Sequence, residues 1–428
     1  MSVGDVLVTD GCEYKTIRKL ALGMESSVWL VERISSRYGL EVNSLLVAKI
    51  LTGEASVRAE AGETAELALH MALRKLHMAL DEKAGRMSFR HTIGLCDNGE
   101  RGGFHFFVFL PHAATLYDIC RGFKNCDLHR DLLLVKRVIK QSIRGLIDIH
   151  QLGFIHTGQR ALFVRHVFDG LPVDLVRLDI KADNLSVPLY ADSKEGLRAF
   201  LEHRTPPLTK ECEVPNIRVQ LGDFSSVIKA PRDTTGVKAM PRPVRAPEII
   251  LGRLWGQAID VWALGCLAME LLLPSLLFFP KHGYDESEYG DYSHLAQMIE
   301  LLGPFSVSSI AKCPENVRSR FFRPDGSLKP ADQFLAESFA RCPEELRSEI
   351  FHSNGSLRHP DVMKLPRPGT LQQLLRNARL RGAELDEVHA FVGRMLTLDP
   401  DYRPTAAQLL EFPLVAKFNM QTNGTIDA

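Results

Sequence analysis

The chain has 428 residues, 45% of them apolar, enough to fill the core of one large two-lobed domain or roughly two to three ordinary ones. Its 52 basic and 52 acidic residues balance, which excludes a global basic field for nucleic acid or an acidic membrane. Eight single cysteines without a CxxC pair predict neither a zinc ribbon nor a disulfide framework and favour a reducing, intracellular compartment. No signal peptide or membrane span is predicted.

Short β-type segments dominate the first part of the chain. The predicted strands are YKTIRKLAL (14–22), SVWLVERI (27–34), LLVAKIL (45–51), HTIGLCD (91–97) and FHFFVFL (104–110). One helix is predicted between them, over residues 57–80. Its inward face would carry Glu66, Leu69, Leu73, Leu76 and Leu80, which recur at helical spacing.

Helical patterns replace the strands after Pro111. The longest predicted helices cover residues 132–153, 258–273, 294–303 and 386–400. This order predicts a small β-rich lobe followed by a larger helical one, joined near residues 109–112. Two segments of the helical part, 313–329 and 342–358, resemble each other at an offset of 29 residues. Two copies are too few for a solenoid, so we interpret them as a local duplication or a chance similarity.

The segment DIKADN (179–184) carries the residue types that phosphoryl transfer to a hydroxyl needs. Asp179 can orient the hydroxyl proton, Lys181 can steady the transferring phosphate, and Asn184 can hold a metal ion. Alone, the pattern DxKxxN is common enough to arise by chance.

Further motifs follow in a fixed order, which makes a chance match a poor explanation. VQLGDFSS places Asp223 after an apolar strand, where it could bind Mg²⁺, and VRAPEII and AIDVWALGC come after it. Upstream, VAKI places Lys49 on the predicted third strand, and LALGMESSVWL lies between the first and second. The series DxKxxN, DF, APE and DxWxxGC matches the protein-kinase signature set.

The chain therefore resembles a eukaryotic protein kinase from residue 14 to 418. Finer features resemble the SR-protein kinases: YKTIRKL, VWL, HT in place of HR, HLAQMIELLGPF, FFRPDGSL and LTLDPDYRPTAAQLL. The resemblance implies an α+β, bilobal protein-kinase-like fold with an N-lobe at 14–111 containing one helix and a mainly helical C-lobe at 112–418. Residues 1–13 would form an N-terminal extension and residues 419–428 a disordered tail.

The resemblance also implies a serine/threonine kinase that uses ATP and Mg²⁺. Asp179 and Lys181 would be catalytic, and Asn184 and Asp223 would hold Mg²⁺. The implied ATP-binding residues are Lys49, Gly23, Ala21, Leu20, Val28 and Glu66. The implied substrate is a serine or threonine in an Arg-Ser-rich, splicing-type protein of the cytoplasm or nucleus, with no direct nucleic-acid or membrane partner. An acidic cluster, Asp285, Glu286, Glu288 and Asp291, would either dock it or be a solvated loop.

The phosphate loop and the predicted partner of Lys49 depart from the family pattern. Of the three loop glycines only Gly23 remains, because Ala21 and Ser26 replace the others. A methyl group at Ala21 narrows the approach of phosphate to the backbone, so weakened ATP affinity is expected. Family register places the partner of Lys49 near Leu69, yet Glu66 opens the inward stripe, and we predict that Glu66 pairs with Lys49.

Other departures concern the surroundings of the motifs. Ser225 replaces the glycine after Asp223-Phe224, which leaves metal binding by Asp223 possible. Thr157 replaces the arginine that grips a phosphorylated activation loop, so a phosphate on Thr234 or Thr235 would lack its usual partner and no phosphorylation switch is predicted. His156 is expected to pack beneath the Asp-Phe motif rather than act as a base, and Arg403 is expected to pair with Glu248.

Residues 158–178 separate HT from DIKADN, although the family joins them directly. Eleven of these 21 residues are apolar, which is unusual for a solvated loop. Three explanations of the insertion remain. It is a real loop that packs on the large lobe, it belongs to the decayed active site of a pseudokinase, or it is an unspliced intron of 63 nucleotides. We favour the intron. The alternative to an active kinase is a pseudokinase, an ATP-binding or scaffold module with the same fold.

Overall fold

The computed structural model describes residues 1–23, 25–84, 90–115, 132–157, 185–188, 218–230, 233–273, 276–278, 288–342 and 369–418, with residues 344, 347, 352, 353 and 356. They belong to two compact units. Unit 1 consists of Met1–Ala230 and Val415–Ala428, and unit 2 of Pro231–Leu414. The predicted insertion (158–178) and the predicted tail (419–428) lie outside the described residues, and the predicted lobe boundaries stay a prediction.

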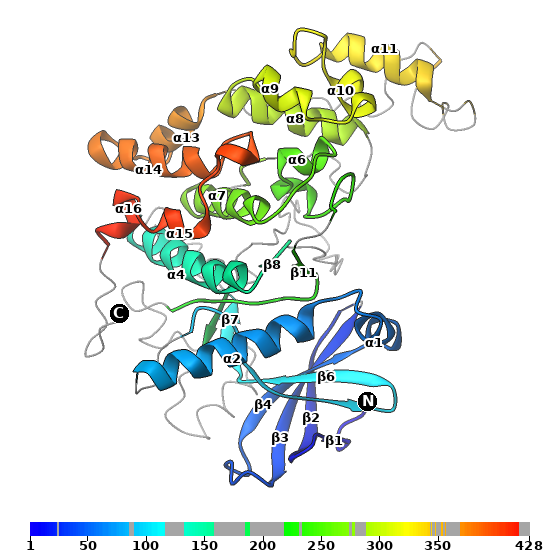
Figure 1. Ribbon diagram of the computed structural model, residues 1–428, viewed down its shortest axis with the longest axis vertical. Helices are drawn as coiled ribbons and strands as arrows, with labels where there is room; N and C mark the ends of the chain where they lie inside the picture. The colour runs from blue at the N-terminus through cyan, green and yellow to red at the C-terminus, as the bar shows by residue number, and fades with distance from the viewer. Residues whose placement is uncertain are drawn as a thin grey trace, which may run out of the picture. The chain divides into compact units, whose positions relative to one another are not determined.

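Unit 1 contains a six-stranded antiparallel sheet in the order β1-β2-β3-β4-β6-β5 (Figure 1). Its strands are β1 (Val6–Val8), β2 (Cys12–Leu22), β3 (Ser26–Ser36), β4 (Leu45–Leu51), β5 (Leu95–Arg101) and β6 (Phe104–Phe109). Strand β1, with Leu7 fully buried, comes from the segment assigned to the N-terminal extension, so Lys49 lies on the fourth strand and not the third. The strand predicted at 91–97 is displaced, because β5 begins only at Leu95 and Thr92 forms an isolated bridge with Leu221.

The two faces of this sheet bury different clusters. Tyr14, Trp29 and Phe106 belong to the cluster on one face. On the other face, Leu51 of β4 and Phe107 of β6 pack together with Ala55 of helix α1 (Gly53–Glu60). Because side chains alternate along a strand, Lys49 shares the face of Leu51. The position of Lys49 in VAKI thus places it on the face that α1 covers.

The single helix predicted over 57–80 is wrong, since α1 and α2 (Glu66–Ala84) are separate helices. Gly62 ends α1 with φ of 72°, and the next amide, that of Glu63, donates to the Arg58 carbonyl. This is the glycine-terminated helix end that favours a residue without Cβ. Leu80 of the predicted inward face is 43% exposed. The buried stripe of α2 is Glu66, Leu69, His70, Leu73 and His77.

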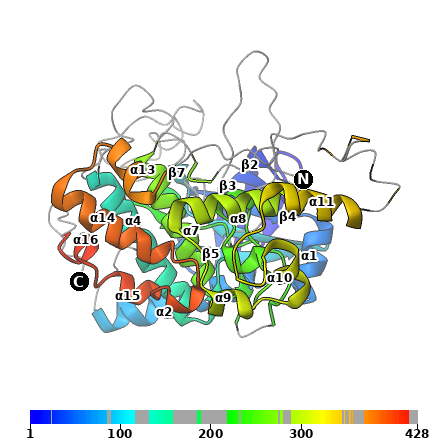
Figure 2. The same cartoon turned by 90° about the horizontal axis from the view of Figure 1, so that it is seen from above.

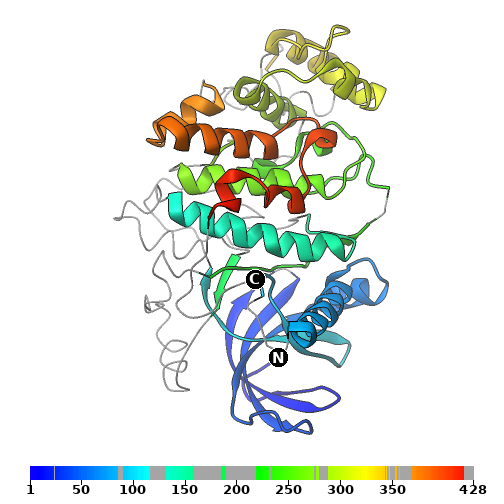
Figure 3. The ribbon, with the colours of Figure 1, turned by 60° about the vertical axis from the view of Figure 1, so that its left-hand side comes forward.

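The rest of unit 1, as far as the structure describes it, contains one long helix and short strands (Figure 3). Helix α4 (Leu132–Gln151) confirms the helix predicted at 132–153. The strands are β7 (His112–Thr115), β8 (Phe154–Ile155), β9 (Leu185–Pro188), β10 (Gln220–Leu221) and β11 (Ile228–Lys229). They form a three-stranded sheet, β10-β9-β7, and a two-stranded sheet, β11-β8. Strand β10 confirms the strand expected before Asp223.

The described part of unit 2 is helical. Its elements are η4 (Arg242–Val244), α6 (Pro247–Ile250), α7 (Ala258–Leu272), α8 (Glu288–Leu302), α9 (Val307–Ala311), α10 (Glu315–Phe321), α11 (Ala331–Arg341), α13 (Leu371–Asn377), α14 (Gly382–Met395), η6 (Pro400–Tyr402) and α15 (Ala406–Leu409). A last helix, α16 (Pro413–Ala416), spans the boundary of the units. None of the helices that the structure describes is long and apolar enough to cross a membrane.

Aromatic stacking and close backbone approach hold the unit 2 helices together. Phe334 of α11 stacks on Tyr292 of α8 and on Phe321 of α10, and these helices lie side by side in Figure 2. Gly265 of the DxWxxGC motif lies on α7, where a Cβ would come within 2.8 Å of Leu396 just after α14. The glycine is therefore needed for the contact between α7 and α14.

The motif residues of unit 2 have structural roles. Arg403 pairs with Glu248 through two hydrogen bonds of 2.6 and 2.7 Å, which confirms the predicted pair. Thr234 is 1% exposed, and its hydroxyl donates to the Trp255 carbonyl (2.7 Å) and accepts from the Trp255 amide (2.9 Å). The buried Thr234 hydroxyl, which both donates and accepts in the core, is no exposed phosphate acceptor. Thr235 is exposed, so the absence of a phosphorylation switch stays a prediction.

The two similar segments share a backbone turn. In the first copy, the Arg323 amide donates to the Ser327 carbonyl at 2.8 Å. In the second, the His352 amide donates to the Ser356 carbonyl, also at 2.8 Å and at the same offset of 29 residues. The shared bond favours a local duplication over a chance similarity.

Candidate active site

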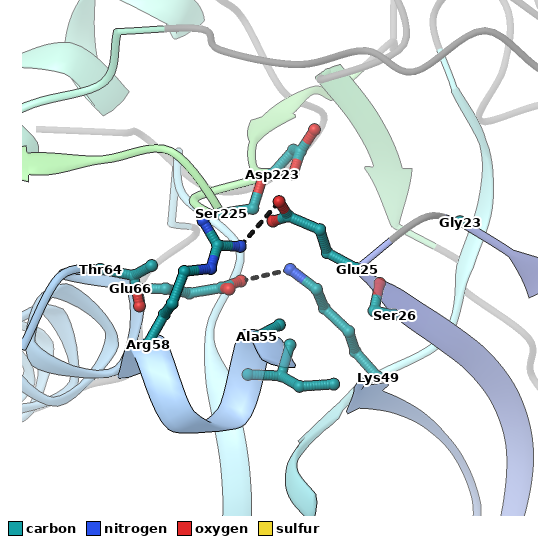
Figure 4. A pocket seen from close by; sticks show the side chains of 11 residues that line it. Gly23, Glu25, Ser26, Lys49, Ala55, Arg58, Thr64, Glu66, Asp223 and Ser225 are labelled. Carbon is teal, nitrogen blue, oxygen red and sulfur yellow. Dashed lines mark hydrogen bonds and ion pairs between the residues drawn. The ribbon is translucent and has the colours of Figure 1, made fainter. Parts of the chain in front are cut away.

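A cavity of about 200 Å³ lies in unit 1 beside the Lys49 face of the sheet (Figure 4). The residues lining it come from the β2–β3 loop, the start of β3, β4, α1, the α1–α2 connection, α2 and the segment after β10. They are Gly23, Glu25, Ser26, Lys49, Leu51, Ala55, Arg58, Thr64, Glu66, Asp223 and Ser225. The cavity thus joins the predicted phosphate loop, the predicted ATP-binding lysine and the predicted metal-binding aspartate.

Lys49 and Glu66 form an ion pair in this cavity, with Nζ 2.6 Å from Oε1. The predicted pairing is therefore confirmed, while Leu69, one turn on, is fully buried in the core. Burial acts to lower the pKa of Lys49, but the charges of Glu66 and Asp223 outweigh it, and the pKa is raised. Lys49 consequently carries a positive charge in the cavity at neutral pH.

Asp223 follows β10 with an exposed side chain and φ of 56°, in the left-handed region that aspartate tolerates better than most residues. The Ser225 hydroxyl donates to its Oδ1 at 2.9 Å. Serine at this position therefore fixes the carboxylate and leaves Oδ2 for a cation. Among the described residues no group of three or more His, Cys, Asp and Glu side chains forms a metal site.

Phe224 anchors the Asp223 segment between two buried histidines. Its ring lies 5.1 Å from His70 of α2 and 5.7 Å from His156. The His156 Nε2 is 2.9 Å from the Gly222 carbonyl, and the residue is fully buried, so the expected packing role is confirmed. Burial, with a smaller effect of Lys49, lowers the pKa of His70 to about 3, so this side chain is neutral at physiological pH.

The other predicted ATP-binding residues differ in position. Gly23 lines the cavity, and a Cβ there would lie 3.3 Å from the Ser26 carbonyl, a contact that glycine avoids. Val28 lies opposite both Ala21 and Lys49 in the strand register, which places the three on one face of the sheet. Ala21, Val28 and Leu20 do not line the cavity, and Leu20 is 37% exposed.

Two charged residues of the cavity lining, Glu25 and Arg58, were missed from the sequence. Glu25 Oε1 lies 2.7 Å from the Arg58 guanidinium, which reaches from α1 to the loop (Figure 4). Gly62 was the signal for Arg58. A helix that ends at this glycine places Arg58 on a short, separate helix directly after β4. The charge of Glu25, two residues after the loop glycine Gly23, was a second signal.

The predicted catalytic residues Asp179 and Lys181 and the predicted metal ligand Asn184 lie outside the described residues. The chain on either side of them is described. The Thr157 hydroxyl donates to the Ser226 carbonyl at 2.5 Å, and Leu185 pairs with Leu221 in the β9–β10 ladder. Both flanks of the interrupted motif are thus attached to the same short segment, residues 221–226, that carries Asp223.

Of the predicted acidic docking cluster, Asp285 and Glu286 lie outside the described residues and Glu288 begins α8. Asp291 accepts from Arg242 at 3.0 Å, with both side chains mostly buried. Its carboxylate thus stabilises unit 2.

Comparison with known proteins agrees with this arrangement. The protein kinase domain family matches residues 208–415. The chain is 27% identical to the serine/threonine-protein kinase SRPK of Physarum polycephalum, over 97% of this chain and 88% of that protein. It is 27% identical to the serine/threonine-protein kinase AFC2 of Arabidopsis thaliana, over 72% of this chain and 59% of that protein. It is 38% identical to the protein kinase dsk1 of Schizosaccharomyces pombe, over 21% of this chain and 16% of that protein.

These similarities confirm the predicted resemblance to SR-protein kinases, the α+β kinase fold and the serine/threonine protein kinase class. Protein kinases in general use ATP and Mg²⁺. In its motifs, its Lys49–Glu66 pair and its match over residues 208–415, the chain is similar to protein kinases.

Proposed function

We propose that this chain transfers the γ-phosphate of ATP to serine or threonine of protein substrates, with the nucleotide phosphates in the cavity of unit 1. The observation that carries the proposal is the Lys49–Glu66 pair in a cavity that Gly23 and Asp223 also line. A charged lysine held by a carboxylate, a loop glycine and an aspartate suit a magnesium-bound triphosphate. Lys49 would orient the phosphates, Glu66 would hold Lys49, and Gly23 would cover them, with Ala21, Leu20 and Val28 toward the rest of the nucleotide.

The metal and transfer roles are proposed for residues of two motifs. Asp223 and Asn184 would hold Mg²⁺, which would neutralise phosphate charge when bound. Asp179 would position the substrate hydroxyl and accept its proton, and Lys181 would steady the phosphate. Support comes from the flanks, because Thr157 and Leu185 are both attached to the segment that carries Asp223.

The substrate proposed is a serine or threonine within an Arg-Ser-rich segment, met in the cytoplasm or the nucleus. It rests on the similarity to the kinase named SRPK and on the motifs shared with that family. Because Asp291 is engaged by Arg242, the proposal does not depend on the acidic cluster.

Nucleotide binding and transfer are tested together. Mg-ATP should raise the melting temperature of the wild-type chain, and γ-labelled ATP should label an Arg-Ser peptide. Asp179→Ala should lower labelling by at least about 10²-fold, because general acid–base groups contribute 10²–10⁴-fold. Asp174→Ala, which changes an aspartate that lacks the Lys and Asn spacing, is the matched control and should label like the wild type. No thermal shift together with no labelling would sink the proposal.

A pseudokinase is the second candidate, favoured by one observation. The Ser225 hydroxyl occupies Oδ1 of Asp223, one of the two oxygens through which that side chain would bind Mg²⁺. A thermal shift with ATP but no labelling by the wild type would support this candidate. Recovery of labelling by Ser225→Gly would assign the defect to that hydrogen bond.

A further inference from the structure

The Glu25–Arg58 ion pair connects the phosphate loop to helix α1 within the wall of the cavity. Arg58 Nη2 lies 2.7 Å from Glu25 Oε1, and the side chains are 31% and 28% exposed. The Nε atom of Arg58 is buried and has no hydrogen-bond partner among the described residues. A buried guanidinium N–H beside a cavity is a donor that still needs an acceptor.

The charges that line the cavity do not suit a polyphosphate while this pair is closed. Glu25, Glu66 and Asp223 supply three carboxylates, whereas Lys49 and Arg58 supply two cations. Lys49 is engaged by Glu66 and Arg58 by Glu25, so every cation in the lining is already neutralised. A phosphate group that enters this cavity without Mg²⁺ meets a net negative charge, and release of Arg58 from Glu25 would supply a cation in addition to the Mg²⁺ proposed at Asp223.

The two ion pairs differ in how readily they can exchange partners. Lys49 and Glu66 are 17% and 7% exposed, so opening their pair would strand a nearly buried carboxylate. Glu25 and Arg58 are about a third exposed, and ion pairs of that kind contribute only ~0–1 kcal/mol. Glu25 also lies on the loop, so its carboxylate can move to solvent. A guanidinium can then bind phosphate through two parallel N–H donors.

We propose that Arg58 is a phosphate-binding residue of the nucleotide site, and that Glu25 is the carboxylate that phosphate displaces from it. When nucleotide binds, phosphate oxygens replace Glu25 on the guanidinium and accept from the orphan Nε–H. Arg58 thereby compensates in part for the glycines that Ala21 and Ser26 replace. The inference rests on the proposed function, since it places the nucleotide phosphates in this cavity.

The test compares nucleotide affinities of four forms of the full chain, namely wild type, Glu25→Gln, Arg58→Gln and the double variant. Calorimetry or thermal shift measures the Kd for Mg-ATP and, as a probe without phosphate, for adenosine. Arg58→Gln should weaken ATP about tenfold, because a charge-assisted hydrogen bond is worth about 1.5 kcal/mol. Glu25→Gln should tighten ATP severalfold. Adenosine affinity should stay the same in all four.

The double variant separates attraction by Arg58 from release of Glu25. If Arg58 binds phosphate, the double variant binds ATP about tenfold more weakly than Glu25→Gln alone. Equal affinities of those two forms would overturn the inference, as would equal losses of ATP and adenosine affinity. Arg74→Gln removes an exposed cation of α2 outside the cavity lining and should leave every affinity unchanged.

Failure of this inference is distinguishable from failure of the proposed function. A wild-type chain that binds and uses ATP, with Arg58→Gln equal to it, overturns the role of Arg58 alone. A wild-type chain that binds no Mg-ATP overturns both.

Discussion

Each unit of the protein contains a buried ion pair, and the two pairs are built differently. In unit 1, Lys49 donates to Glu66 and, among the described residues, to nothing else. In unit 2, Arg403 donates twice to Glu248 and also to the carbonyls of Thr397, Ala258 and Leu398, at 2.7, 3.0 and 3.3 Å. Trp262 lies against its guanidinium, and both members of the unit 2 pair have fully buried side chains.

The difference separates the proposed nucleotide-binding group, Lys49, from a structural one, Arg403. Arg403 has no donor to spare, because its N–H groups are divided between Glu248 and three backbone carbonyls. Lys49 has three N–H donors and faces a cavity, so two of them remain for a ligand. Burial of an ion pair therefore does not identify its role. The number of N–H donors that remain without an acceptor in the protein does.

The largest expected effect comes from breaking the unit 2 pair on one side. Arg403→Met should lower the free energy of unfolding of unit 2 by about 3–5 kcal/mol, because it leaves the Glu248 carboxylate buried without a counter-charge. Urea unfolding measures the loss. Arg394→Met removes an exposed arginine of α14 and should change stability by less than about 0.5 kcal/mol. A loss at position 403 no larger than that of the control would contradict the structural role.

The second-largest effect is expected when both charges of the Arg403–Glu248 pair are removed. Glu248→Gln combined with Arg403→Met should still cost about 3 kcal/mol, since three carbonyls lose their donor at about 1 kcal/mol or more each. The midpoint of urea unfolding, with its slope, gives this value. A double variant as stable as the wild type would mean that the backbone contacts contribute nothing.

A smaller effect depends on pH and concerns His70, beside the unit 1 pair. Its pKa is about 3 in the folded chain against 6.5 in a free side chain, so the unfolded state binds a proton more readily below pH 6.5. Stability is full above that pH and falls as the pH drops toward 3. Between pH 7 and 5 the contribution lost is about 2 kcal/mol. In His70→Leu, the free energy of unfolding should fall by about 2 kcal/mol less between pH 7 and pH 5 than in the wild type. An equal fall in both proteins would refute this role of His70.

The smallest effect is expected from replacing the whole unit 1 pair. Lys49→Met with Glu66→Leu should change the free energy of unfolding by no more than about 1 kcal/mol, because a buried ion pair is often replaced by apolar residues without loss. The same variant should lose its thermal shift with Mg-ATP. If the variant keeps its thermal shift with Mg-ATP, the Lys49–Glu66 pair is not needed for nucleotide binding.

Local patterns predicted much of the fold. Strand runs rich in β-branched and aromatic residues placed β2, β3, β4 and β6, and apolar periodicity placed α4, α7 and α14. The error in the first helix arose because the inward stripe of α2 was extended backward through Gly62, whose positive φ ends α1. Strand β1 was missed because three residues are too short for a period to appear.

The candidate site was predictable where a residue type is tied to a motif, as for Lys49, Asp223 and Gly23. Glu66 required a choice between two registers, and the burial of Leu69 decides it. Gly62 and the charge of Glu25 could have pointed to Arg58 and Glu25 as separate residues of the site. Their contact with each other has no spacing in the chain to predict it, because it depends on how α1 follows β4. The roles of Asp179, Lys181 and Asn184 remain predictions.

The backbone hydrogen bond that occurs twice in unit 2 provides two copies of one local structure within the same molecule. The amides of Arg323 and His352 donate to the carbonyl four residues further on, although Pro324 in one copy is Ser353 in the other. Proline fixes φ before folding begins, whereas serine does not. The two copies therefore form the same backbone hydrogen bond although the unfolded chain has less conformational entropy around Pro324 than around Ser353. Exchanging these two residues would therefore measure, inside a single molecule, how much of a turn's stability is decided before the chain folds.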